Sequence, residues 1–169
     1  MYKIRVILDT KKDVIRTILV DDNINLENLH KIITQTFGFK GKEMASFYRT
    51  DDEWVQGEEI PLFNMAEAGE EISMKTCILN ETLSKENDKL IYVYDFLNMW
   101  TFYVDVIEIS LEKREDLPQI ILSVGDIPEQ AAEKEFIAEM DRSRRGQSSA
   151  SIDFSLAVFA ALRRAPIRA

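Results

Sequence analysis

Apolar and polar side chains alternate at the start of the chain, where Tyr2, Ile4, Val6 and Leu8 occupy every second position. The polar stretch "DTKKD" follows, and residues 14–20 ("VIRTILV") are rich in β-branched side chains. A period of two is typical of a strand with one buried face, and β-branched residues favour strands. We therefore predict that these two segments form a β-hairpin.

The clearest helical pattern lies between residues 25 and 37. Its stripe of core-facing positions consists of Leu26, His30, Ile33 and Phe37. These positions recur at helical spacing, Asn25 before them is a suitable N-cap, and Gly38 after them is a stop signal. We predict one main helix over about residues 25–37, with its apolar stripe against a sheet.

Two segments in the middle of the chain have the composition of short strands. They are "MASFYRT" (44–50) and "EWVQG" (53–57), joined by the acidic turn "TDDE". Residues 58–76 read as loops with one more extended piece, and "CILNETLSKEND" (77–88) suggests one or two helical turns.

The pattern "KLIYVYDF" (89–96) followed by "WTFYVDVIEI" (100–109) predicts a strong hairpin. Alternation places Tyr92 and Tyr94 on one face of its first strand, and Asn98 is the turn residue best suited to a left-handed conformation. "LPQIILSV" (117–124) can add a strand, and residues 129–140 have the composition of an exposed terminal helix.

These elements predict an α+β fold, in which β-hairpins form an antiparallel or mixed sheet packed on one main helix. A length of 169 residues fits a single such domain. We place the domain at residues 1–128, followed by an acidic helical extension at 129–141 and a basic tail at 142–169.

The boundary before the tail comes from the charge distribution. Residues 1–141 hold 15 basic and 29 acidic side chains, including all eleven lysines, whereas residues 142–169 hold six arginines and one aspartate. The tail has three open interpretations: a source of positive charge for nucleic acid, an apolar and basic membrane-surface segment, or a segment foreign to the original gene.

Composition argues against several classes of function. The acidic body would repel phosphates, so we expect no nucleic-acid binding by the folded domain. Apolar runs fall well short of the roughly 20 residues of a membrane span. The lone Cys77 permits no internal disulfide, which favours a reducing, cytoplasmic setting.

Catalytic and cofactor chemistry also lacks its usual residues. His30 and Cys77 are single, so zinc has no ligand set, and the six glycines form no phosphate loop. The acidic clusters lack the spacing of a calcium loop. We therefore expect no catalytic residue, metal or cofactor, and interpret His30 either as packing against the sheet or as opening onto a pocket.

Five segments occur together in the order and spacing of a known family. They are "YKIRVIL" (2–8), "IRTILV" (15–20), "NLENLHKIITQTFGF" (25–39), "SFY" (46–48) and "LIYVYDFLNMW" (90–100). Over about residues 2–130 the chain resembles the plasmid pRiA4b ORF-3-like family. The matching residues are Arg16, Leu29, His30, Phe37, Gly38, Phe39, Tyr94, Asp95, Phe96 and Trp100.

The resemblance implies an α+β fold and an association with plasmids and transposable elements, and it names no activity. The chain departs from the family pattern at three positions. Leu97 and Asn98 stand where the family usually has Gly-Asp, and Phe102 stands where a histidine is expected. The chain therefore resembles a divergent member.

Our leading hypothesis is a non-catalytic binding or protein-interaction module of a bacterial plasmid or mobile element, with an acidic surface suited to a basic protein partner. The alternative is a small-ligand-binding protein or enzyme with a pocket near the 94–100 hairpin, formed by His30, Tyr94, Asp95 and Trp100. A weaker alternative is a DNA-associated accessory protein.

Overall fold

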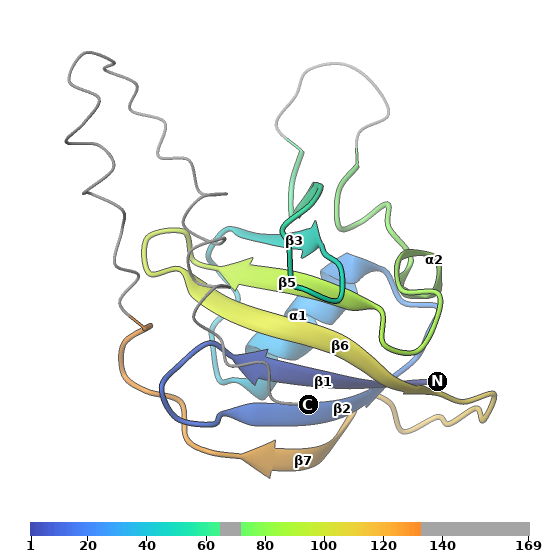
Figure 1. Ribbon diagram of the computed structural model, residues 1–169. Helices are drawn as coiled ribbons and strands as arrows, with labels where there is room; N and C mark the ends of the chain where they lie inside the picture. Colours follow the sequence, from blue (N-terminus) through green and yellow to red (C-terminus); the bar gives the residue numbers. More distant parts are fainter. Residues whose placement is uncertain (65–71, 133–169) are drawn as a thin grey trace.

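Seven strands and two helices form the part of the chain that the computed structural model describes, residues 1–64 and 72–132. In chain order they are β1 (Tyr2–Leu8), β2 (Ile15–Val20), α1 (Leu26–Thr36), β3 (Ala45–Arg49), β4 (Glu59–Pro61), α2 (Leu79–Thr82), β5 (Lys89–Tyr94), β6 (Trp100–Ile109) and β7 (Gln119–Val124). All seven strands belong to one sheet, in the order β4-β3-β5-β6-β1-β2-β7 (Figure 1). Every pair of neighbours is antiparallel, so the sheet is not mixed.

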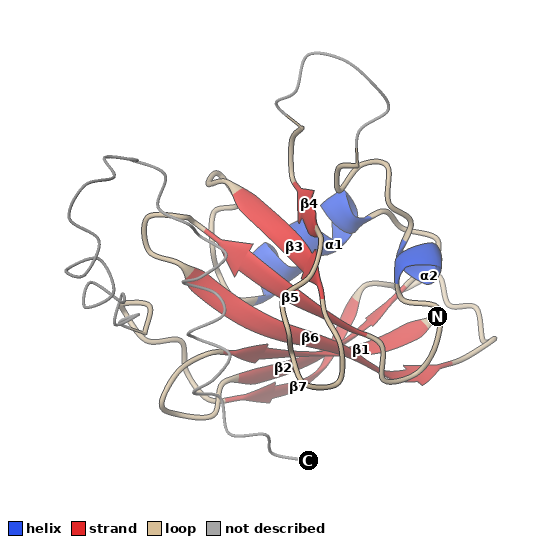
Figure 2. Ribbon diagram, turned by 45° about the horizontal axis from the view of Figure 1, so that its top comes forward, coloured by secondary structure: helices blue, strands red, loops and turns tan. Residues whose placement is uncertain are grey.

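Helix α1 lies across one face of this sheet (Figures 1 and 2). It begins as predicted, because Asn25 Oδ1 accepts a hydrogen bond from the backbone N–H of Asn28 at 2.9 Å. The chain leaves the helix through Gly38, whose φ of 76° is a left-handed conformation that glycine adopts at little cost. Leu29 and Ile33 are fully buried beneath the helix. The predicted stripe is therefore the face that packs on the sheet.

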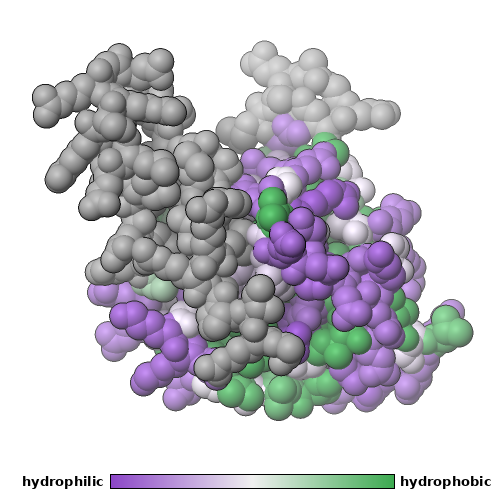
Figure 3. Space-filling view, in the orientation of Figure 1, coloured by the Kyte–Doolittle hydropathy of each residue, from purple (hydrophilic) through white to green (hydrophobic). Residues whose placement is uncertain are grey.

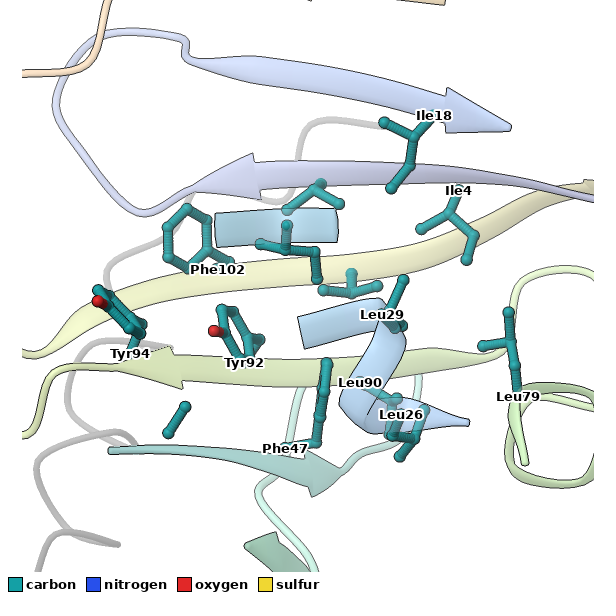
Figure 4. Packing of buried hydrophobic residues seen from close by; sticks show 14 of the residues in the cluster. Ile4, Ile18, Leu26, Leu29, Phe47, Leu79, Leu90, Tyr92, Tyr94 and Phe102 are labelled. Atoms are coloured by element: carbon teal, nitrogen blue, oxygen red, sulfur yellow. The ribbon is translucent and has the colours of Figure 1, made fainter. Parts of the chain in front are cut away.

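The main core fills the space between α1 and the sheet (Figure 4). Leu26 and Leu29 of the helix lie over the strands that carry Tyr92 and Phe102, and all four side chains are fully buried. Tyr94 belongs to the same cluster as Tyr92. The predicted alternation along β5 is thus confirmed.

A second, smaller cluster lies on the opposite face of the sheet. It consists of Tyr48, Ile91, Val93, Met99 and Tyr103. The indole of Trp54 packs edge-on against Tyr103, with ring centroids 5.0 Å apart. Because β5 and β6 bury side chains on both faces, their sequences read as nearly continuous apolar runs.

One predicted strand, residues 53–57, is wrong. The Asp51 carboxylate accepts hydrogen bonds from the backbone N–H groups of Glu53 at 2.9 Å and Val55 at 3.0 Å, and Trp54 has a φ of 60°. These features belong to a loop. The strand that pairs with β3 is β4, which begins two residues later.

Helix is less abundant than the α+β prediction implies, with 11 residues in α1 and four in α2. The predicted terminal helix at 129–140 is not helical at residues 129–132, and residues 133–141 lie outside the described part. The tail at 142–169 also lies outside it. Within residues 1–64 and 72–132, neither helix has the length and apolar character needed to cross a membrane.

Candidate functional site

His30 lies in the middle of α1 and points into the main core, where only 2% of its surface is exposed. Its Nδ1 lies 2.6 Å from the hydroxyl oxygen of Tyr92 on β5. The imidazole ring also contacts Tyr94, with ring centroids 6.2 Å apart. His30, which the sequence places against the sheet, therefore forms a hydrogen bond with Tyr92 of the sheet.

Burial sets the protonation of this pair. It lowers the pKa of the His30 imidazole to about 4, with the Glu27 carboxylate opposing and the Lys31 ammonium reinforcing the shift. Burial also raises the pKa of the Tyr92 hydroxyl well above its usual range. At neutral pH both groups are uncharged, so the hydroxyl can donate its proton to Nδ1 when His30 carries its own proton on Nε2. The arrangement is a neutral hydrogen bond within the core.

Tyr94 and Trp100 face each other across the β5–β6 ladder and form an aromatic cluster with Phe39. The Phe39 ring lies 5.1 Å from Tyr94 and 5.0 Å from Trp100, between ring centroids. Phe39 reaches this position because it directly follows the left-handed Gly38. The cluster joins the exit of the helix to the end of the hairpin, and both hairpin residues are buried.

Asp95 does not join this cluster, because it forms the hairpin turn. Its φ is 61°, and its carboxylate accepts hydrogen bonds from the backbone N–H of Leu97 at 3.1 Å and from Asn98 Nδ2 at 2.6 Å. Its carbonyl accepts a hydrogen bond from the N–H of Met99 at 2.6 Å. The left-handed residues of the turn are therefore Asp95 and Met99, so the prediction of Asn98 is wrong. Asp95 is preferred here because its short polar side chain stabilises both this conformation and the turn.

Phe102 occupies the position where the family resemblance leads one to expect histidine. It is fully buried, and its ring lies 4.7 Å from Phe37 and 5.5 Å from Tyr92, between centroids. An imidazole at this position would stand beside the Tyr92 that bonds His30. In this chain the position therefore belongs to the apolar core.

Arg16 on β2 attaches β7 to the rest of the sheet. Its guanidinium donates hydrogen bonds to the backbone carbonyls of Ile15 at 2.9 Å, Val124 at 2.8 Å and Gly125 at 3.1 Å. Its Cζ lies 5.3 Å from the centre of the Phe37 ring. Arg16 is one of the residues that match the family pattern. Its role in this structure is to hold the end of β7 through hydrogen bonds to backbone carbonyls.

The two edges of the sheet are built differently. The β4 edge is three residues long and contains the charged Glu59 and Pro61, which has no N–H group to donate. The β7 edge is six residues long, contains neither charge nor proline, and none of the described strands pairs with its outer side. Short length, charge and proline are the usual devices that protect an edge from pairing. The β4 edge has all three. The β7 edge has none of these three, although the register shift between Ile120 and Leu122 in its pairing with β2 is a bulge, which is a further device of this kind.

β7 also exposes large apolar side chains. The exposed fractions are 51% for Ile120, 44% for Ile121, 48% for Leu122 and 39% for Val124. Figure 3 shows apolar surface along the lower rim of the molecule, where β7 lies in Figure 1. The sequence predicted this strand but not its exposure, because an uncharged segment such as "QIILSV" is typical of a buried strand and no local signal places it at an edge.

Metal-binding geometry is absent from residues 1–64 and 72–132, where no three His, Cys, Asp or Glu side chains converge. Cys77 is partly buried against the main core. Of the four residues predicted to bind a ligand, the structure brings together His30, Tyr94 and Trp100, and it places Asp95 in the turn.

Comparison with known proteins gives a family and a fold. The family model of the plasmid pRiA4b ORF-3-like protein matches residues 1–134, which is most of the chain. The crystal structure of the protein of unknown function MM3350 from Methanosarcina mazei Go1 is similar, with a TM-score of 0.58 and 22% identity over 72% of this chain and 67% of that chain. No curated protein matches. The chain therefore belongs to the plasmid pRiA4b ORF-3-like protein family.

Proposed function

We propose that this protein is a non-catalytic protein-interaction module, and that β7 is the edge at which it binds another polypeptide. The observation that carries the proposal is the contrast between the protected β4 edge and the open, uncharged, apolar β7 edge. An open edge presents unpaired N–H and C=O groups that an extended polypeptide can pair with. Exposed apolar side chains beside them add contact area.

The interior of the protein supports the same assignment. His30, Tyr94 and Trp100 are at most 7% exposed, and their contacts are with one another or with neighbouring core residues. Residues so placed stabilise a fold and have little surface to offer a substrate. The alternative, a small-ligand site at the 94–100 hairpin, has correspondingly less support.

The biological setting and the partner's charge belong to the proposal as well. The family name supports an association with plasmids. A formal net charge of −9 favours a basic protein over nucleic acid as a partner of the remaining surface. DNA association is therefore the weaker alternative.

Site-specific photo-cross-linking in the native host tests the proposal. A photoreactive phenylalanine analogue replaces Leu122 on β7 in one variant and Leu97, which is 94% exposed in the β5–β6 turn, in a matched control. We expect a covalent adduct with a polypeptide from position 122 and none from position 97. Absence of an adduct at position 122, or equal adducts at both positions, overturns the proposal.

A further inference from the structure

We infer that the polypeptide that pairs with β7 is a second copy of this chain, joined through an antiparallel β7–β7 contact about a two-fold axis. This inference rests on the proposed function, because it names the occupant of the same edge. The contact would extend the antiparallel sheet from one copy into the next. Three features of β7 support it.

The first feature is charge. β7 is the one strand of the seven described that has no charged side chain; each of the other six has at least one. The carboxylate nearest its start, that of Asp116, is already held by two hydrogen bonds from Arg114, at 3.0 and 2.8 Å. The strand therefore offers no carboxylate to select a basic partner. An uncharged strand is complementary to another uncharged strand, and β7 of a second copy meets that condition.

The second feature is symmetry. In an antiparallel pair about a two-fold axis, one surface meets the same surface on the other copy, so a self-complementary strand satisfies both sides at once. "QIILSV" contributes large apolar side chains at four of its six positions. Strand pairing would place the exposed apolar side chains of the two copies beside one another, with no charged side chain from either strand among them.

The third feature is length, which sets the expected strength. The strand has six residues, and a register shift between Ile120 and Leu122 in its pairing with β2 shortens the regular part. A contact made by one six-residue strand from each copy is small beside a standard protein–protein interface, which has roughly 20–30 residues a side. We therefore expect a reversible dimer that forms and dissociates with concentration.

Sedimentation equilibrium of the purified full chain tests the inference. The wild type, Leu122→Lys and the matched control Leu97→Lys are compared from micromolar to millimolar concentration. Both substitutions replace an exposed leucine by lysine, and thermal unfolding confirms that each variant folds. In the symmetric contact of Leu122→Lys, the two introduced ammonium groups would approach each other, so association should weaken by at least about tenfold.

The expected result is a weight-average mass that rises from 19.6 kDa towards twice that value for the wild type and Leu97→Lys, while Leu122→Lys remains monomeric. Added salt should strengthen association, because each copy has a net charge of −9 and salt screens the repulsion. A basic peptide or the chain's own basic residues 142–169 would bind less tightly as salt rises.

Three results overturn the inference: a monomeric wild type at all concentrations, equal association of Leu122→Lys and the wild type, or association weakened by salt. These outcomes leave the proposed function intact if position 122 still cross-links to a different polypeptide in the host. If position 122 forms no adduct, the proposed function fails as well.

Discussion

The burial of His30 should make the folded protein less stable as the pH falls from about 7.5 to about 5.5. His30 is the one histidine in the chain, and its burial beside Tyr92 lowers its pKa to about 4 from an ordinary value near 6.5. In the unfolded chain the imidazole regains the ordinary pKa. Between these two values the unfolded state binds a proton that the folded state does not, so stability falls as pH decreases.

The size of the effect follows from the two pKa values. A shift of about 2.5 units corresponds to roughly 3 kcal/mol once pH lies below both values. Between about pH 7.5 and about pH 5.5 the expected loss is about 1.3 kcal/mol, because the unfolded imidazole becomes mostly protonated while the folded one stays neutral. This window lies above the pH at which most carboxylates titrate.

Urea unfolding at each pH, for the wild type and for His30→Gln, isolates the contribution of His30. Glutamine keeps a hydrogen-bonding group near the Tyr92 hydroxyl but does not titrate. The contributions of all other titratable groups to the free energy of unfolding are shared by the two proteins, so they cancel in the difference. We expect the stability advantage of the wild type to shrink by about 1.3 kcal/mol over the window. A difference that stays constant with pH would refute the buried, neutral state of His30. A difference that grows on acidification would mean that the folded protein favours the charged imidazole.

Two further substitutions test the roles assigned to polar residues. Asp95→Ala should cost about 1–2 kcal/mol in urea unfolding, because alanine loses the turn hydrogen bonds and is strained at a φ of 61°, whereas Asp95→Asn should cost less than half of that. Equal costs would mean that the negative charge of Asp95 matters. Arg16→Lys should cost about 1–3 kcal/mol and speed amide hydrogen exchange in β7, because lysine cannot reach the three carbonyls that the guanidinium bonds. Unchanged exchange in β7 would show that Arg16 does not hold this strand.

Local patterns predicted the elements whose signals are local. The helix from Asn25 to Gly38 contains its own cap, stripe and stop signal, and the β5–β6 hairpin follows from alternation across a short turn. The family resemblance, drawn from five segments in order, is confirmed by the match over residues 1–134. These features depend on neighbours within a few residues, which a sequence displays directly.

Features that depend on distant neighbours could not be predicted in the same way. The aromatic and β-branched residues of 53–57 suggested a strand, but Trp54 packs against Tyr103 from a loop. The hydrogen bond between His30 and Tyr92 joins residues 62 positions apart. Likewise, "QIILSV" reads as an ordinary buried strand until the strand order places it at an edge of the sheet. Composition alone does not say what covers a strand.

Photo-cross-linking at Leu122 in the native host tests most directly whether β7 binds a polypeptide. The expected result is one polypeptide adduct at position 122, identified by mass spectrometry as a second copy of this chain, and no adduct at Leu97. An adduct with another protein would support β7 as a docking edge, but it would mean that the partner is not a second copy of this chain. No adduct at position 122, with the variant folded and expressed, would contradict the assignment of function to this edge.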